Sequence, residues 1–283
     1  ALSENLLSKF PNKFEKVFLV NSGSEANELA LRLARTYTGK MDFITFDHGY
    51  HGNTNAAIEV SPYKFNKPNG IGKRDWVHVI DCPDKFRGVD PRNQVAKVLQ
   101  DMHFHGRAVA GFISEIFPSV AGQIIPQPGI LHEIYAEIRE AGGLCIADEV
   151  QTGLGRLGSY YFGFEQQKVV PDIVVLGKPI GNGHPIGAVV TTKKIAKAFD
   201  NGIEFFSTFG GSDLSCLIAN EVLEIIDDEK LGENAQQMGL LFQEGLEKLK
   251  CNFPLIGDVR GMGLFWGIEI IRGIETREPG SSE

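Results

Sequence analysis

The sequence lacks several features that would have assigned it to a class. It contains no apolar run of 18 residues, so we expect no transmembrane helix. Its first residues, Ala1–Asn5, are neither basic nor followed by an apolar segment, so we expect no signal peptide. Basic residues are also outnumbered: the chain has 28 Lys and Arg and 36 Asp and Glu, which gives a formal net charge of −8. This balance argues against nucleic acid or a membrane as the main partner.

Cysteine is scarce as well. The four cysteines lie far apart and show no C-x-x-C spacing: Cys82, Cys145, Cys216 and Cys251. This pattern favours reduced, buried thiols in a cytoplasmic protein over a disulfide framework or a zinc site. His103 and His105 have no further metal-ligating side chains at suitable spacing nearby. We interpret them as surface or helix-cap residues and expect no metal.

Short apolar runs alternate with helical patterns through most of the chain. The patterns predict strands at 17–20, 43–46, 76–80, 109–114, 144–147, 173–176 and 188–191, and helices at 24–36, 93–102, 130–141 and 193–199. This alternation predicts an α/β fold with a mainly parallel sheet and helices on both faces. Ligands bind such sheets beyond the carboxyl ends of the strands.

The pattern changes beyond Gly211. Long helices are predicted at 214–227 and 231–250, followed by one strand at 263–271. We therefore expect a large cofactor-binding domain at 1–230 and part of a smaller α+β domain at 231–283. One strand and one or two helices make a thin core, so we expect a C-terminal portion of the small domain to be missing.

Two charged residues follow buried strands. Asp148 ends the run Ile146-Ala147-Asp148, and Lys178 follows Ile173–Gly177. Asp148 could be a metal ligand, a cap, or a partner that keeps a pyridine nitrogen protonated. An isolated lysine would simply reach solvent, but the glycines and prolines around Lys178 favour a crevice, where it can act as a nucleophile. Together the pair could hold and tune a pyridoxal phosphate (PLP) ring.

A third strand end offers a phosphate site. Ser22 and Glu25 have the spacing of a capping box at the start of a helix. The free N–H groups of Gly23 and Ser24 would lie at the positive end of that helix, where phosphate binds well. Alone, this motif predicts only a well-capped helix.

The chain resembles class III aminotransferases, PLP enzymes of fold type I, over nearly all 283 residues. The resemblance rests on these segments: NSGSEAN (21–27), GYHG (49–52), ADEVQTGLGRLG (147–158), PDIVVLGKPIGNGHPIGAV (171–189), TFGG (208–211) and GDVRGMGLFWGIE (257–269). It implies transfer of an amino group between an amine or amino acid and a keto acid.

The resemblance also implies how these residues contact the cofactor. Lys178 would form a Schiff base with PLP and shuttle protons, and Asp148 would pair with the pyridine nitrogen. Val150 would pack on one face of the ring and Tyr50 on the other. Gln151 would approach the phenolic oxygen of the ring.

The remaining implied roles concern the phosphate and the subunits. Gly23 and Ser24 would hold the phosphate, and Glu115 would support the Asp148 region by hydrogen bonding. Thr208 would reach the phosphate of the neighbouring subunit's cofactor, so the resemblance implies a homodimer with shared active sites.

The chain departs from the family at 212–213, where Ser-Asp replaces the usual Asn-Pro. Arg260 is interpreted as structural rather than as a clamp for a substrate carboxylate.

Two alternatives stay open. Stretches 58–65, 122–126 and 255–260 resemble ethanolamine-phosphate phospho-lyases and alanine–glyoxylate aminotransferase 2-like proteins, which favours a lyase that acts on a phospho-amine. The loop at 64–74 carries cations that either bind a substrate phosphate or simply face solvent: Lys64, Lys67, Lys73 and Arg74. The other alternative is an inactive fragment or a non-catalytic protein of the same fold.

Overall fold

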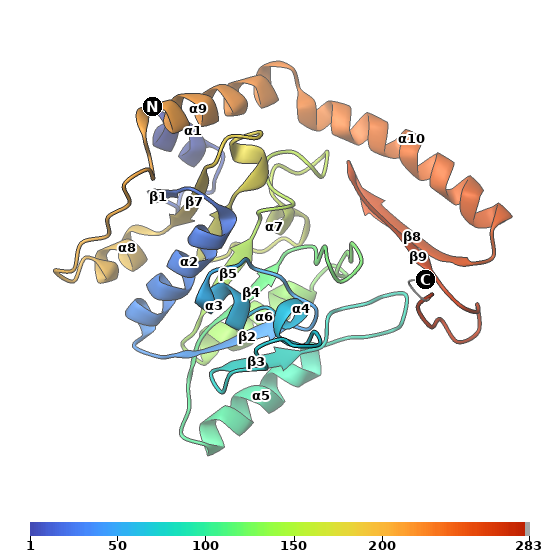
Figure 1. Cartoon of the computed structure of the whole chain (residues 1–283), viewed down its shortest axis with the longest axis horizontal. Coiled ribbons are helices and arrows are strands. Elements are labelled where there is room, and N and C mark those ends of the chain that lie inside the picture. The colour runs from blue at the N-terminus through green and yellow to red at the C-terminus, as the bar shows by residue number, and fades with distance from the viewer. Residues whose placement is uncertain (281–283) are drawn as a thin grey trace.

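A seven-stranded sheet forms the centre of the computed structural model, which describes residues 1–280 (Figure 1). Its spatial order is β1-β7-β6-β5-β4-β2-β3. The strands are β1 (Lys16–Val20), β2 (Asp42–Phe46), β3 (Val77–Ile80), β4 (Val109–Glu115), β5 (Leu144–Asp148), β6 (Ile173–Leu176) and β7 (Gly187–Thr191). Strands β2 to β6 are parallel, and β7 is antiparallel to both β1 and β6. The predicted mainly parallel α/β sheet is confirmed.

Both faces of the sheet are buried, which explains why its strands read as continuous apolar runs. Successive side chains of a strand point to opposite faces, so Phe43 and Ile44 of β2 belong to separate core clusters. Helices cover these clusters and bury their apolar sides. They are α2 (Gly23–Thr38) and α8 (Lys193–Phe199) on one face, and α5 (Arg92–Phe104) and α6 (Ile130–Glu140) on the other.

Several short helices were not predicted. They are α1 (Leu2–Ser8), α3 (Asn55–Glu59), α4 (Pro62–Phe65), α7 (Gly163–Gln166) and the 3₁₀ turn η1 (Lys178–Ile180). Each is too short to show the helical period over two full turns, so tertiary packing rather than sequence pattern defines it.

The last part of the described chain forms a layer that packs against the main core through residues such as Leu223 and Phe265. Helix α9 (Asp213–Asp228) is followed by α10 (Leu231–Asn252), and Lys230 between them has a left-handed φ of 52°. Strands β8 (Ile256–Met262) and β9 (Phe265–Ile270) then pair as an antiparallel hairpin beside α10. Figure 1 shows α10 and the β8–β9 hairpin, in orange and red, to the right of the main sheet, whereas α9 lies beside α1. The domain boundary near 230 stays a prediction.

The expectation of a single strand in this layer was wrong. Strand β9 matches the predicted strand at 263–271, but β8 precedes it. Every residue of β8 is half-buried, and its sequence is interrupted by Gly257, Asp258, Arg260 and Gly261. The sequence of β8 therefore lacks the alternation of apolar and polar residues that predicts a strand.

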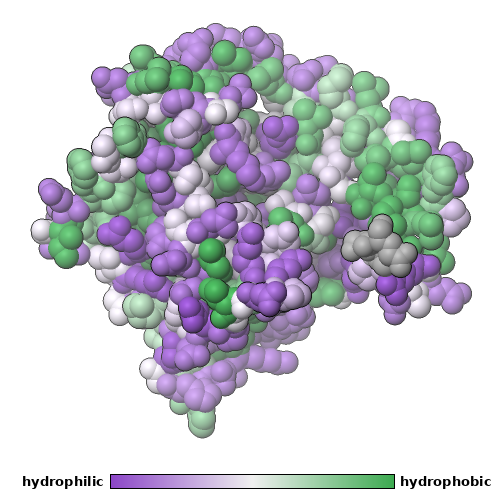
Figure 2. Space-filling view, viewed as in Figure 1, coloured by the Kyte–Doolittle hydropathy of each residue, from purple (hydrophilic) through white to green (hydrophobic). Residues whose placement is uncertain are grey.

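Apolar side chains gather on the outside of this layer. Figure 2 shows them over α10 and the β8–β9 hairpin. The exposed members include Leu240, Leu241, Phe242, Ile268 and Ile270. Within residues 1–280, no helix has the length and apolar content needed to cross a membrane.

The cysteines and the H-x-H pair are placed by the structure. All four thiols are free; Cys145 is buried, but Cys251 is exposed, so the expectation of uniformly buried thiols was wrong. His105 is the C-cap residue of α5 and is exposed, as is His103.

Candidate active site

Three strand ends meet at one edge of the sheet and surround a cavity of about 400 Å³. Asp148 ends β5, Lys178 follows β6, and Gly23 follows β1. Every predicted site residue except Thr208 lines this cavity: Gly23, Ser24, Tyr50, Glu115, Asp148, Val150, Gln151 and Lys178. The parallel register explains the convergence, because Asp148 is the partner of Glu115 on β4 and of Val175 on β6.

Asp148 is a buried carboxylate held by three donors. Its Oδ2 accepts hydrogen bonds from Asn27 Nδ2 and His51 Nδ1, both at 2.8 Å, and its Oδ1 accepts one from Val150 N at 3.1 Å. Because an ionised carboxylate only accepts, the Nδ1 atom of His51 must carry the proton. These bonds offset the cost of burying the charge and fix the carboxylate at the cavity.

Asn27 and His51 are site residues whose role the sequence analysis missed. Asn27 lies one helical turn after Gly23, on the same face of α2. His51 is fully buried in the GYHG segment, and its carbonyl also accepts from Asn27 Nδ2 at 2.9 Å. Both segments were recognised as motifs, but only the fold reveals that the two side chains meet at Asp148.

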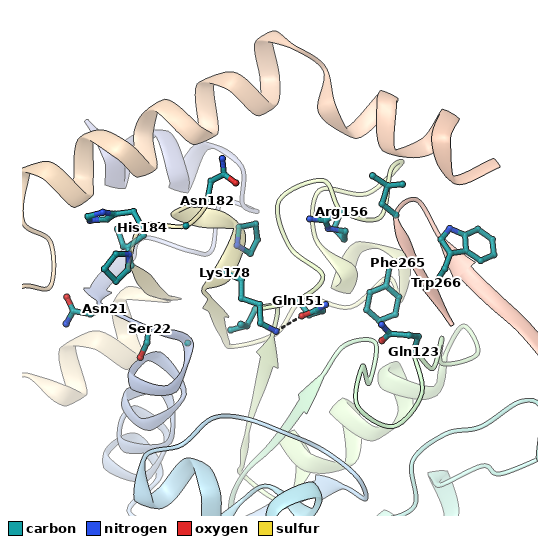
Figure 3. A pocket seen from close by; sticks show the side chains of 17 residues that line it. Asn21, Ser22, Gln123, Gln151, Arg156, Lys178, Asn182, His184, Phe265 and Trp266 are labelled. Atoms are coloured by element: carbon teal, nitrogen blue, oxygen red, sulfur yellow. Dashed lines mark hydrogen bonds between the residues drawn. The ribbon is translucent and has the colours of Figure 1, made fainter. Parts of the chain in front are cut away.

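Lys178 projects into the cavity from a strained position. It begins the turn η1 with a φ of 35°, a left-handed value that non-glycine residues rarely adopt. Its Nζ donates a hydrogen bond to Gln151 Oε1 (Figure 3). Such strain persists at functional sites, where the surrounding structure holds the backbone in place.

The cavity has side chains suited to the two faces of a flat ring. Val150 lies on one wall, where a Cβ added to Gly23 would come within 3.0 Å of Val150 Cγ2. Glycine at this position therefore lets the start of α2 approach the end of β5. The Tyr50 ring also lines the cavity and packs edge-on against Tyr63, with ring centroids 6.0 Å apart.

The start of α2 is built to bind an anion. Ser22 Oγ accepts from Glu25 N at 3.1 Å, which confirms one half of the predicted capping box. Glu25 Oε2 accepts instead from Asn21 N, the residue before the N-cap, at 2.8 Å. Within residues 1–280, the backbone N–H groups of Gly23 and Ser24 have no hydrogen-bond partner. Two free N–H groups at the positive end of a helix suit a phosphate.

Gly52 closes the wall beside this helix end. Its φ is 131°, and a Cβ there would lie 2.5 Å from Ser24 Oγ. Only glycine therefore lets this loop approach the start of α2 so closely.

Taken together, the cavity offers a helix end for a phosphate, a buried carboxylate for a ring nitrogen and a reachable amine. This donor set fits PLP.

Glu115 lines the cavity, whereas Thr208 lies outside it. Glu115 accepts hydrogen bonds from Ser119 N (3.2 Å), Ser119 Oγ and Tyr50 N (3.4 Å), so it supports the cavity wall and does not bond to Asp148. Burial, and next the charge of Asp148, raise the pKa of Glu115. Thr208 is exposed and does not line the cavity of its own chain.

A larger cavity of about 800 Å³ adjoins the first, sharing Gly23, Gln123, Val150, Gln151 and Lys178 with it. Figure 3 shows Arg156, His184 and Trp266 around it. No Asp or Glu is among its lining residues in the described chain, whereas Arg156 and Lys178 carry positive charge. This cavity therefore favours anionic ligands.

The predicted cations of the 64–74 loop separate into two groups. Lys64 Nζ lies 5.4 Å from the centroid of the Tyr50 ring, and Lys67 Nζ lies 4.8 Å from that of Tyr63. Lys64 is therefore close to a side chain that lines the cavity, whereas Lys67 lies against Tyr63, which does not line it. In contrast, Lys73 Nζ donates to the Val77 carbonyl and Arg74 pairs with Glu59, each at 3.0 Å, so these two are engaged elsewhere.

Arg260 is structural, as interpreted from the sequence. Its guanidinium donates to the Gly122 carbonyl at 2.9 and 2.6 Å, to Asp258 at 3.1 Å and to Glu269 at 2.6 Å. Burial alone would raise the pKa of Glu269, but the hydrogen bonds from Arg87 and Arg260 outweigh it and lower this pKa.

The Ser-Asp departure at 212–213 has a local explanation. Ser212 is the N-cap of α9, where its Oγ accepts from Ser215 N at 3.3 Å. Asp213 places a negative charge in the first turn of that helix, which favours helix formation. Serine and aspartate therefore suit this helix start well.

The model of the family "aminotransferase class-III" matches residues 1–278. The chain belongs to this family. It is 47% identical to a Drosophila melanogaster protein named alanine–glyoxylate aminotransferase 2-like, over 98% of this chain and 59% of that protein. It is 40% identical to ethanolamine-phosphate phospho-lyase homolog 1 of Caenorhabditis elegans, over 98% of this chain and 64% of that protein. The chain thus spans about three fifths of the length of these curated relatives.

Solved structures agree in fold. A phospholyase from Arthrobacter, in complex with phosphoethanolamine, superposes with a TM-score of 0.91 and 38% identity, covering 99% of this chain and 68% of that one. Other structures of similar fold carry PLP. The family and these structures indicate PLP as the cofactor.

Proposed function

We propose that this protein is a PLP-dependent aminotransferase that moves an amino group between an amine or amino acid and a keto acid through a Schiff base at Lys178. The observation that carries this proposal is the convergence of Lys178, Asp148 and the start of α2 on one cavity. The bound cofactor supplies an electron sink that stabilises negative charge at the carbon next to the amino group.

The residues of the chain would divide the work around that cofactor. The carboxylate of Asp148 would hold a proton at the pyridine nitrogen, kept in place by its bonds to Asn27 and His51. Gly23 and Ser24 would bind the phosphate through their N–H groups. Lys178 Nζ would move a proton to or from the substrate carbon as a general acid and base, oriented by Gln151.

The substrate we propose carries an anionic group besides its amine. Arg156 and Lys178 face a cavity that has no acidic lining residue in the described chain. A carboxylate or a phosphate would gain from this positive field. A neutral amine would not.

A phospho-lyase is the second candidate. It is supported by the similarity to the C. elegans phospho-lyase homologue and to the Arthrobacter phospholyase. Lys64, close to the Tyr50 ring, adds a cation at the cavity wall that could meet a substrate phosphate.

One experiment tests both candidates. The PLP-loaded protein is given O-phosphoethanolamine without any keto acid, and inorganic phosphate is followed. Sustained release over many turnovers identifies a phospho-lyase and contradicts the transaminase proposal. Absence of release, together with keto-acid-dependent amino transfer from a panel of amines, supports the transaminase. Absence of both activities, with no uptake of PLP, favours a non-catalytic protein.

We further propose a homodimer with shared active sites and a cytoplasmic location. The exposed position of Thr208, outside its own cavity, suits a residue that contacts the partner's cofactor. Free cysteines suit a reducing compartment. Some relatives are named as mitochondrial, so fractionation of cells is the test of location.

A further inference from the structure

Gln123 carries two unfavourable features. Its φ is 55°, in the left-handed region that side-chain-bearing residues rarely adopt. Its side-chain Oε1 is buried without a hydrogen-bond partner among the described residues. Backbone strain and an unsatisfied buried polar atom both point to a functional constraint when they occur beside a binding cavity.

Gln123 lies beside such a binding cavity. It lines both the 400 Å³ cavity with Asp148 and the 800 Å³ cavity with Arg156. Figure 3 shows it next to Gln151 and Phe265. Within residues 1–280, its amide nitrogen makes no hydrogen bond and is not among the buried unpaired atoms. The amide therefore has its nitrogen end available to a ligand in the cavity.

The β8–β9 hairpin fixes this residue from behind. The carbonyl of Gly122 accepts two hydrogen bonds from Arg260 on β8, at 2.9 and 2.6 Å. A Cβ added to Gly267 on β9 would lie 2.7 Å from the Cβ of Gln123. The strained conformation is thus held by the hairpin and not by the loop alone.

We propose that Gln123 is a substrate-binding residue, whose amide N–H donates a hydrogen bond to the anionic oxygen of an amine substrate. Arg156 supplies charge in the same cavity, and the neutral amide adds a directional bond. The anion is a phosphate or a carboxylate. This inference rests on the proposed function and deepens it, because it names a residue that separates anionic from neutral amines.

The test uses equilibrium binding to PLP-loaded protein, in a Lys178→Ala background so that bound substrate is not converted. Calorimetry measures the dissociation constants of O-phosphoethanolamine, L-alanine and neutral ethanolamine. Gln123→Leu keeps the side-chain volume and removes the donor. We expect the dissociation constant to rise about tenfold for one or both anionic ligands and to stay unchanged for ethanolamine. The ligand that weakens identifies phosphate or carboxylate as the partner.

Two further variants separate binding from folding. Gln127→Leu is the matched control, because Gln127 lies on the same loop, is exposed and lines neither cavity. It should leave all three constants unchanged. Gln123→Gly removes the side chain and tolerates the left-handed φ, so we expect a melting temperature no lower than that of the parent and the same weakening.

The outcomes that contradict the inference are distinct from failure of the proposed function. Unchanged anion binding in Gln123→Leu and Gln123→Gly overturns the role of Gln123, even if the parent binds both anions. Equal weakening of ethanolamine also overturns it, because the effect would then not concern the anion. A parent protein that binds none of the ligands overturns the proposed function, and the inference with it.

Discussion

Asp148 depends on residues that lie far from it in the sequence. Asn27 and His51 contribute the two shortest hydrogen bonds to its carboxylate, across 121 and 97 positions. The sequence motifs predicted Asp148, Lys178 and Gly23 because these residues stand at recognisable strand and helix ends. They could not predict the two supporting donors, since a polar side chain inside a motif does not show which distant atom it contacts.

Replacing His51 tests this support. His51→Leu keeps a similar volume but leaves Asp148 without one donor in a buried position. We expect the free energy of unfolding to fall by about 2 kcal/mol and PLP to bind about tenfold more weakly, measured by denaturation and by titration with PLP. The control is His48→Asn, an exposed residue of the same loop with a φ of 61°, which asparagine tolerates. Equal effects of both changes would contradict the assigned role.

Glu149 predicts a pH dependence of stability. Burial raises its pKa to about 7, although Thr152, Gly163 and Phe164 donate hydrogen bonds to it. The folded state keeps the proton that the unfolded chain releases near pH 4.5. The contribution of Glu149 to stability is therefore fully present below about pH 4.5 and is lost as the pH rises to about 7, by roughly 3 kcal/mol.

Urea unfolding between pH 4.5 and 8 measures this slope. Glu149→Gln cannot titrate, so its free energy of unfolding should be lower at pH 4.5 yet flatter across this range. It should be lower because the amide leaves one backbone donor unpaired. An equally steep slope in both proteins would show that another group causes the pH dependence.

At the scale of elements, length and burial decided what the sequence revealed. Strands β4 and β5 are buried along their whole length, so their apolar runs predicted them directly. The half-buried strand β8 and the four-residue helices α4 and α7 have no such pattern. The position of β8 follows from contacts made after folding, among them those of Arg260 with the Gly122 carbonyl and Glu269.

Arg260 should decide how firmly the β8–β9 hairpin is attached. Arg260→Met keeps the apolar stem but removes the donor to the Gly122 carbonyl. It also removes one of the two cations beside Asp258 and one of the two beside Glu269. We expect a loss of about 3 kcal/mol in the free energy of unfolding and faster proteolytic cleavage within β8 and β9. The control is Arg272→Met, which removes an exposed arginine with no ion pair among the described residues. A hairpin that stays protected in Arg260→Met would contradict this account.

At the scale of the whole molecule, one predicted cofactor contact lies outside the cavity. The cavity gathers every predicted cofactor contact except Thr208, which is exposed. The sequence could predict that residue only through resemblance to a family. A single chain does not contain the neighbour on which it would act.

Mixed dimers test whether Thr208 serves the partner's site. We expect Thr208→Val and Lys178→Ala homodimers to be impaired, the first about tenfold through loss of a hydrogen bond to a charged phosphate. A dimer with one subunit of each kind would contain one site that has both Lys178 and the partner's Thr208. Its activity should recover to about half that of the wild type. No recovery on mixing would show that Thr208 acts within its own subunit, and an unimpaired Thr208→Val homodimer would show that it has no role.

The central claim is that Lys178 holds PLP in the cavity at the strand ends. The most direct measurement is reduction of the PLP-loaded protein with borohydride, followed by digestion and mass spectrometry. We predict that the added mass lies on the peptide that contains Lys178 and is absent in Lys178→Ala. Attachment to another lysine, such as Lys64, or no attachment at all, would contradict the account.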